Sequence, residues 1–247
     1  MPWTPRAPSS LCALGLALGL SACKPAPTEP AAPSPAAAPE ATSDDSRPAK
    51  SESALDPLMH PELATRRAPD EFEVRFETTR GDFLVAVHRD WAPLAADRFF
   101  NLVEAGYYQE VAFYRAVPNF MVQFGVHGDP FVTQKWNDAP IPDEPATHSN
   151  LTGTIAFAKS KAPNSRTAQL FINTVDNQFL DELEFAPFGE VHTGMYTVLS
   201  LYTGYGECAP MGEGPNQRRF TDEGNPYLSD FPRLDYIQTA TVVSSPH

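Results

Sequence analysis

Hydrophobic and polar residues alternate along Glu71–Thr78, where the second, fourth and sixth residues are apolar and their neighbours are mostly charged. A period of two predicts a β-strand with one buried face. The turn residues Gly81-Asp82 and the apolar run Phe83–His88 follow, so the pattern predicts a hairpin. Six further short strands are predicted at Val111–Arg115, Met121–Phe124, Gly153–Ala158, Gln169–Thr174, Phe188–His192 and Ile237–Val243.

Two segments have helical spacing. Pro93 stands where a first helical turn tolerates proline, Gly106 stands where a helix ends, and apolar residues recur between them every three or four positions. Met195–Tyr202 fits a second short helix. Eight short strands and two helices predict a mainly β domain, either a closed antiparallel barrel or a sandwich. Tyr205–Arg233 shows no period and is predicted to be one long loop.

The first 23 residues have the three parts of a secretory signal. Arg6 supplies a positive charge, and the apolar run Leu11–Leu20 is shorter than the roughly 18–20 residues of a membrane-spanning helix. The ending Leu20–Cys23 (LSAC) resembles the lipobox of bacterial lipoproteins, which implies cleavage before Cys23 and acylation of its thiol. Lys24 at the next position favours the outer membrane. The alternative is an ordinary signal peptide cut near the same place.

The next segment, Lys24–Pro69, contains ten of the 26 prolines and the low-complexity run Pro30–Glu40. Such a composition buries too little apolar surface to offset the entropy lost on ordering. We therefore expect a disordered tether between the membrane and a folded domain at 70–247. The alternative is a proline motif that a partner binds.

Charge and cysteine content exclude several classes of function. The chain has 18 Lys+Arg against 31 Asp+Glu, a net charge of -13, which predicts no nucleic-acid partner. Beyond the signal region Cys208 is the remaining thiol, so no internal disulfide is expected. The histidines are scattered, which predicts no metal site and no cofactor. Asp143-Glu144 could be an acid–base pair, but carboxylates that bind loop backbone are the simpler interpretation.

One stretch concentrates candidate binding chemistry. Phe113–Gly125 (FYRAVPNFMVQFG) places Arg115 and Gln123 among apolar and aromatic residues. A cation and an amide among such side chains would make a binding groove with two polar anchors. The alternative, which composition alone favours, is an exposed charge on a strand whose apolar residues belong to the core.

The same stretch resembles the signature of the cyclophilin family of peptidyl-prolyl cis/trans isomerases, which reads Phe-His-Arg…Pro-x-Phe-Met-x-Gln. Two further family blocks follow in order. They are GTIAFA with PNSRTAQLFINTVDNQFLD, between Gly153 and Asp181, and Phe188–Val191 followed by Gly194-Met195. The resemblance implies an eight-stranded antiparallel barrel capped by two helices, over 70–247. It implies isomerase activity that needs no cofactor.

Carried over by position, the resemblance implies Arg115 as the catalytic residue. Tyr114 replaces the usual His beside it, and Phe179 stands where many eukaryotic members have Trp. Phe185 falls near a further pocket position. The residues implied to bind the substrate are Phe120, Met121, Gln123, Gln169, Phe171, Phe179 and Leu180.

Together these features predict a monomeric, lipid-anchored isomerase of a bacterial cell envelope, with its domain in the periplasm. It would act on proline-containing segments of secreted or outer-membrane proteins. Two alternatives remain open at this level: a module that binds proline peptides or acts as a chaperone without turnover, and a structural lipoprotein whose domain docks to a partner.

Overall fold

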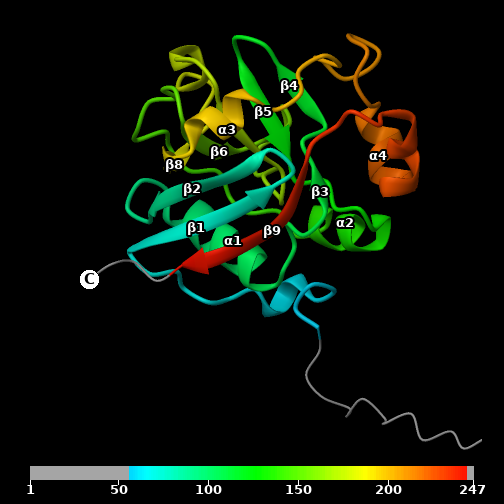
Figure 1. Ribbon diagram of the computed structural model, residues 1–247. Helices are drawn as coiled ribbons and strands as arrows, with labels where there is room; N and C mark the ends of the chain where they lie inside the picture. Colours follow the sequence, from blue (N-terminus) through cyan, green and yellow to red (C-terminus); the bar gives the residue numbers. More distant parts are fainter. Residues whose placement is uncertain (1–55, 244–247) are drawn as a thin grey trace, which may run out of the picture. The chain divides into compact units, whose positions relative to one another are not determined.

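The alternating segment forms a strand with a neighbour on each side. The computed structural model describes residues 56–243. Strand β1 (Glu71–Thr78) pairs antiparallel with β2 (Gly81–His88) on one side and with β9 (Tyr236–Val243) on the other. Figure 1 shows β9, close to the C-terminus, lying beside β1. The alternation thus buries every second side chain of β1, as predicted.

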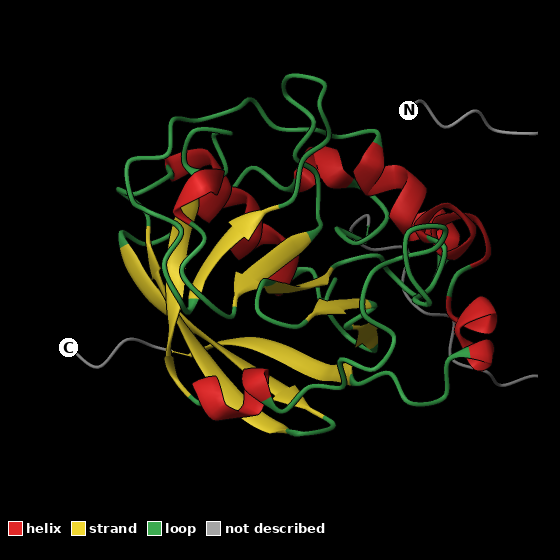
Figure 2. Cartoon of the chain, turned by 90° about the horizontal axis from the view of Figure 1, so that it is seen from above, coloured by secondary structure: helices red, strands yellow, loops and turns green. Residues whose placement is uncertain are grey.

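The strands form one nine-stranded sheet in the order β3-β9-β1-β2-β8-β6-β7-β5-β4. The remaining strands are β3 (Val111–Ala112), β4 (Arg115–Val117), β5 (Met121–Phe124), β6 (Thr154–Phe157), β7 (Leu170–Asn173) and β8 (Pro187–Thr193). Figure 2 shows how strongly the strands curve. The sheet is a curled half-barrel, because its end strands β3 and β4 do not pair with each other within 56–243.

The prediction of a closed eight-stranded barrel is therefore wrong in closure and strand number. The predicted strand Val111–Arg115 breaks into β3 and β4, because β3 pairs with β9 at one end of the sheet and β4 pairs with β5 at the other. Phe113 N donates to Asp235 O (2.9 Å), which extends the pairing of β3 with β9, and the Tyr114 hydroxyl donates to Gln169 Oε1. Arg115 then begins a new strand that pairs with β5.

Four α-helices lie within residues 56–243, two more than predicted. They are α1 (Pro93–Glu104), α2 (Pro130–Asn137), α3 (Met195–Leu199) and α4 (Gln217–Glu223), with three short 3-10 helices at Pro61–Leu63, Gln178–Leu180 and Asn225–Asp230. Asp129 caps α2 by accepting from Phe131 N, and Asn216 caps α4 by accepting from Arg219 N. None of the helices in this part of the chain has the length and apolarity needed to cross a membrane.

The main core lies between the sheet and α1 and is built from stacked and edge-on aromatic rings. Phe76 and Phe83, directly opposite each other on β1 and β2, stack with ring centroids 4.8 Å apart. Phe99 of α1 contacts Phe76 from the helix side, and Phe124 of β5 meets it edge-on at 5.9 Å. All four rings are buried. This core fixes β5, and with it the neighbouring strand that carries Arg115.

The segment predicted as a long loop, Tyr205–Arg233, contains a second, smaller core. Its buried side chains pack against residues beside β3 and β5. Those members are Cys208, Phe220, Tyr227 and Leu228 from the segment, packed with Leu234, Ala112, Tyr114 and Val126. Helices α2 and α4 lie side by side at this end of the molecule (Figure 1). The segment is therefore an ordered part of the domain.

The predicted tether ends too late, because residues 56–69 pack onto the domain. Leu58 and Met59 contact the main core, and the buried Trp136 donates its indole N–H to Leu58 O (2.8 Å). Ala68 is buried, and its N–H donates to Asp97 Oδ1 of α1 (2.8 Å). Sequence analysis did not predict these contacts, because the anchoring residues Asp97 and Trp136 lie far from 56–69 in the sequence. The rest of the predicted tether, and Cys23, lie outside the described residues.

This packing predicts that a chain beginning at Asp70 is less stable than one beginning at Asp56. Loss of the hydrogen bonds that Leu58, Arg66 and Ala68 make to the domain, and of the apolar contacts of Leu58 and Met59, should lower the free energy of unfolding by at least about 3 kcal/mol. Urea unfolding of both chains measures the difference. Equal midpoints would show that residues 56–69 contribute nothing to stability.

Candidate functional site

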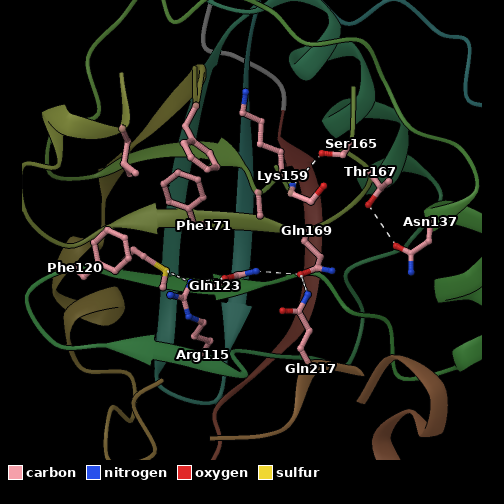
Figure 3. Close-up of a pocket in the computed structure, with 15 residues that line it drawn as sticks. Arg115, Phe120, Gln123, Asn137, Lys159, Ser165, Thr167, Gln169, Phe171 and Gln217 are labelled. Atoms are coloured by element: carbon pink, nitrogen blue, oxygen red, sulfur yellow. Dashed lines mark hydrogen bonds between the residues drawn. The ribbon is translucent and has the colours of Figure 1, made fainter. Parts of the chain in front are cut away.

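A cavity of about 530 Å³ opens at the edge of the sheet where β4, β5 and β7 meet (Figure 3). Its walls contain seven of the eight predicted site residues, all except Phe179. The lining residues are Arg115, Phe120, Met121, Gln123, Asn137, Ala158, Lys159, Ser160, Ser165, Thr167, Gln169, Phe171, Leu180, Phe185 and Gln217. One end of the cavity is apolar and the other polar, with Arg115 and Gln123 at the boundary.

The apolar end is built from a hydrophobic cluster separate from the main core. Met121, Phe171 and Leu180 are buried in it, and the partly buried Phe120 and Phe185 pack against them. The rings of Phe171 and Phe185 meet edge-on with centroids 5.6 Å apart. A cluster that faces a cavity instead of the core offers a water-poor surface for a small apolar ring.

Phe179 does not line the cavity, contrary to the prediction. Its side chain is 57% exposed and stacks on the ring of Phe120, with centroids 6.0 Å apart. Phe179 lies in the 3-10 helix Gln178–Leu180, in which the next residue, Leu180, is the one that turns inward. In so tight a turn, neighbouring side chains point in different directions. Phe179 therefore supports Phe120 from outside.

Pairing of β4 with β5 places Arg115 directly opposite Gln123. Side chains at paired positions share a face of the sheet, so Arg115 Nη1 donates to Gln123 Oε1 (2.8 Å). Met121 Sδ lies 3.9 Å from the same Nη1, and the guanidinium carbon lies 5.9 Å from the centre of the Phe120 ring. One nitrogen of the guanidinium is therefore held at the mouth of the apolar end.

The other edge of the guanidinium pairs with Glu207. Arg115 Nε donates to Glu207 Oε1 (2.6 Å) and Nη2 donates to Oε2 (2.7 Å), the two-bonded fork typical of strong arginine–carboxylate pairs. Burial opposes the charged form of Arg115, but the hydrogen bonds to Glu207 outweigh it and raise the pKa of the guanidinium. The same bonds lower the pKa of Glu207. Both groups are thus ionised at neutral pH.

A chain of amides and one phenol orders the polar end. Gln123 Nε2 donates to Tyr114 Oη (2.6 Å) and to Gln169 Oε1 (3.0 Å), and Tyr114 Oη donates to Gln169 Oε1 (2.6 Å). Gln217 Nε2 of α4 donates to the same oxygen at 3.1 Å. Burial raises the pKa of Tyr114 well above its usual value, so the phenol keeps its proton and can donate. These hydrogen bonds fix both glutamines that were predicted to bind the substrate, Gln123 and Gln169.

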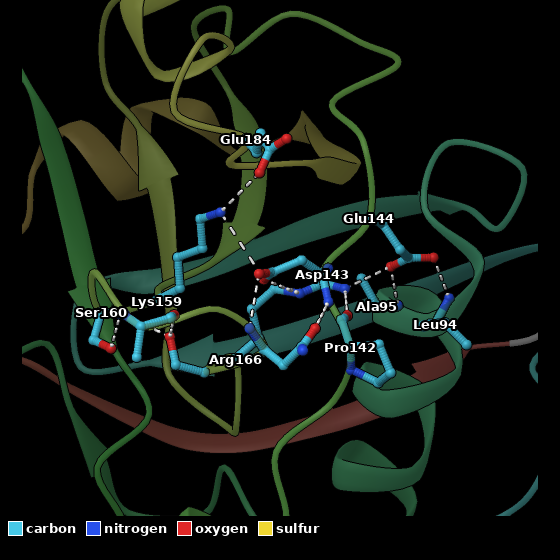
Figure 4. A network of polar contacts seen from close by, with 12 residues as sticks. Leu94, Ala95, Pro142, Asp143, Glu144, Lys159, Ser160, Arg166 and Glu184 are labelled. Carbon is cyan, nitrogen blue, oxygen red and sulfur yellow. Dashed lines mark hydrogen bonds and ion pairs between the residues drawn. The ribbon is translucent and has the colours of Figure 1, made fainter.

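Lys159 and a charged network form the outer rim of the polar end (Figure 4). Lys159 Nζ lies 3.9 Å from Asp143 Oδ1 and 3.8 Å from Glu184 Oε2. The buried Arg166 donates Nη2 to Glu144 Oε2 (3.0 Å) and to Pro142 O. These bonds hold the two segments that border this side of the cavity.

Glu144 has a structural task. Its Oε1 and Oε2 accept from Leu94 N (2.7 Å) and Ala95 N (3.0 Å), the free amides at the start of α1. Helix α1 begins after Ala92, which has no capping side chain, so a carboxylate 50 residues away takes that place. Asp143 Oδ2 in turn accepts from Asn164 N (2.8 Å), so the interpretation of Asp143-Glu144 as carboxylates that bind backbone is confirmed for both residues.

Glu207, Gln217 and Lys159 were missed by the sequence reasoning. Glu207 and Gln217 lie in the segment predicted as a loop, whose small core brings Gln217 to the cavity and Glu207 to Arg115. The asparagine cap before α4 was the available signal for an ordered element there. Cys208 beside Glu207 is buried, and burial raises its pKa to about 11, so its thiol stays protonated.

Comparison with known proteins places this geometry in a family. The family model of the cyclophilin type peptidyl-prolyl cis-trans isomerases matches residues 73–217. Peptidyl-prolyl cis-trans isomerase B of Escherichia coli (strain K12) is 37% identical over 133 residues, which are 51% of this chain and 80% of that protein. The peptidyl-prolyl cis-trans isomerase of Acinetobacter baylyi is 35% identical over 130 residues, 51% of this chain and 69% of the relative.

Solved structures support the same fold. A crystal structure of a cyclophilin type peptidyl-prolyl cis-trans isomerase of Cryptosporidium parvum has a TM-score of 0.54 at 22% identity, over 71% of this chain and 99% of that one. The same protein was also crystallised in the presence of the dipeptide Ala-Pro. The mainly β fold and the isomerase activity expected from the three sequence blocks are thereby confirmed. The chain belongs to the cyclophilin family and is a peptidyl-prolyl cis-trans isomerase of that type.

Proposed function

We propose that the cavity isomerises X–Pro bonds of polypeptides in a bacterial cell envelope, with Arg115 as its catalytic residue. The observation that carries the proposal is the placement of the Arg115 guanidinium at the boundary between an apolar pocket and a row of ordered amides. An X–Pro segment has the matching chemistry, an apolar ring flanked by peptide groups. That a protein of similar fold was crystallised in the presence of the dipeptide Ala-Pro fits this class of ligand.

The pocket holds the proline ring among Phe120, Met121, Phe171 and Leu180, with Phe185 closing one side. Gln123 and Gln169 face the backbone of the peptide, since their ordered amides lie between the apolar end and the polar rim. Water is excluded from the ring, which removes solvent that would stabilise the planar, more polar amide.

Rotation about an X–Pro bond crosses a barrier of about 18–20 kcal/mol, because the amide has partial double-bond character. At the upper value the uncatalysed rate is on the order of 10⁻² per second. In the twisted transition state the prolyl nitrogen regains its lone pair and can accept a hydrogen bond. A guanidinium N–H aimed at that nitrogen binds the transition state more strongly than the planar ground state, which lowers the barrier. No bond of the chain is made or broken.

The envelope location is proposed from the N-terminal sequence. The lipobox ending in Cys23 and the proline-rich segment after it fit a monomer anchored by lipid, preferably in the outer membrane, with the domain in the periplasm. Two or more acyl chains hold a protein firmly to a bilayer. Secreted and outer-membrane proteins that fold nearby would be the substrates.

Exchange NMR on a short Ala-Pro peptide tests the proposed site, using the chain from Lys24 onward. Catalysis should broaden or exchange the cis and trans peptide signals, and bound peptide should shift the signals of Phe171, Met121 and Leu180. Shifts confined to another surface would refute the assignment of the cavity. Binding at the cavity without faster exchange would favour the peptide-binding or chaperone module instead.

Fractionation of cells tests the envelope proposal separately. The full chain should sediment with the outer membrane and incorporate labelled fatty acid, whereas the Cys23→Ser variant should appear unlabelled in the soluble periplasmic fraction. Equal distribution of both forms would overturn the lipid anchor and leave the isomerase site untouched.

A further inference from the structure

The carboxylate beside Arg115 comes from a segment with its own anchorage. Glu207 precedes the buried Cys208, which packs with Phe220 and Tyr227 in the small core of Tyr205–Arg233. Gly214 N donates to Glu207 O (2.8 Å), and a Cβ at Gly212 would lie 2.4 Å from that oxygen. The surrounding loop thus encloses the backbone of Glu207, which fixes the position from which the Glu207 side chain extends.

The hydrogen bonds of Glu207 divide the guanidinium into two edges. Oε1 and Oε2 take the Nε and Nη2 edge, and Oε1 also accepts from Cys208 N (2.8 Å), which orients the carboxylate. Nη1 is left to Gln123 and to the apolar end of the cavity. Within residues 56–243, Glu207 is the one carboxylate that pairs with Arg115. Glu207 itself does not line the cavity.

This division has a functional consequence. A long arginine side chain held at one point retains many rotamers, whereas a guanidinium fixed by a two-bonded carboxylate keeps one orientation. A donor that is already in place needs no reorganisation as the transition state forms. Glu207 binds the Nε and Nη2 edge of the guanidinium, which faces away from the cavity. It therefore restrains Arg115 without occupying the space for the substrate.

We propose that Glu207 is a positioning residue of the isomerase, which holds the Arg115 guanidinium so that Nη1 points at the prolyl nitrogen. The proposal rests on the catalytic role proposed for Arg115. It assigns the segment Tyr205–Arg233 a part in catalysis, because its small core carries the residue that orients the guanidinium.

The test replaces Glu207 by glutamine, which has nearly the same shape but presents an N–H to one of the two arginine donors. We expect kcat for an Ala-Pro peptide to fall about tenfold, since a small displacement of a catalytic group is enough for such a loss. KM should stay within about twofold, because the cavity walls are unchanged. The matched control is Glu213→Gln, an exposed glutamate of the same loop, which should keep the wild-type rate.

Arg115→Ala separates a positioning role from a structural one. In the Arg115→Ala background, Glu207→Gln should lower kcat no further, because there is no guanidinium left to hold. A further loss in that background would show a structural effect and overturn the proposal. The Arg115 Nε–H signal, sharp in the wild type, should broaden in Glu207→Gln while the unfolding midpoint changes little. If Glu207→Gln does not fold, Glu207→Asp, which keeps the charge at shorter reach, replaces it in the same comparison.

The outcomes also distinguish this inference from the proposed role of Arg115. A wild-type kcat in Arg115→Ala would overturn both. A loss in Arg115→Ala with an unchanged or raised kcat in Glu207→Gln would leave Arg115 catalytic and overturn the positioning role. A higher KM at constant kcat in Glu207→Gln would place Glu207 in substrate binding and also overturn it.

Discussion

Replacing Arg115 by alanine should lower kcat for a prolyl peptide by about hundredfold, the loss typical of removing one preorganised donor to the transition state. The side chain is 23% exposed and held by Glu207 and Gln123, so it reaches the reacting amide without first being ordered. KM should change far less than kcat, because the ring-binding walls remain. Exchange NMR over a range of peptide concentrations measures both.

Two further arginine variants define the cause of that loss. Arg115→Lys keeps the positive charge but loses the planar fork, so it should restore only part of the activity and remain about tenfold below the wild type. Arg218→Ala removes an arginine that is 92% exposed on α4 and should leave kcat unchanged. Near-normal kcat in Arg115→Ala, with the fold intact by circular dichroism, would contradict the catalytic role.

Replacing Glu144 by alanine should lower the free energy of unfolding by about 3 kcal/mol, the largest loss of stability expected here from a single substitution. Two consequences add together. The amides of Leu94 and Ala95 lose their acceptor at the start of α1, and Arg166, whose side chain is 2% exposed, loses its hydrogen-bonded carboxylate. A buried guanidinium without that partner is far more destabilising than an exposed one. Urea unfolding measures the change.

Glu104→Ala is the matched control for Glu144→Ala. Glu104 also pairs with an arginine, Arg66, but the two side chains are 39% and 63% exposed, so the loss should be less than about 1 kcal/mol. Adding Arg166→Met to Glu144→Ala should recover part of the stability, because the buried charge then disappears. Equal losses in Glu144→Ala and Glu104→Ala would show that burial does not strengthen the pair.

The local pattern of hydrophobic and polar residues predicted two strands correctly. Strand β1 follows the strict alternation of Glu71–Thr78, and β5 has the predicted bounds Met121–Phe124. The family blocks also predicted most of the cavity, since Arg115, Met121 and Gln123 lie close together in the sequence on two strands joined by a short turn. These residues are close in sequence, and they are therefore also close together in the folded structure.

Long-range contacts explain what the local pattern missed. The break between β3 and β4 arises because β3 pairs with the distant strand β9, whereas β4 pairs with β5 at the other end of the sheet, so the sheet has nine strands and stays open. Helix α1 is capped by a carboxylate from a distant loop, and the segment before Asp70 is anchored by Trp136. Each of these contacts joins groups far apart in sequence, and no periodicity over a short window contains them.

The amino-acid sequence by itself determined the family, the hairpin of β1 and β2 and the residues around the proline-sized pocket, because motif order and local spacing carry that information. Only the tertiary structure decided which phenylalanine lines the cavity and which carboxylate pairs with Arg115. Phe179 turns outward because its neighbour Leu180 takes the inward position of the turn. Glu207 lies 92 residues from Arg115 and reaches it because a small core folds its segment against the edge of the sheet.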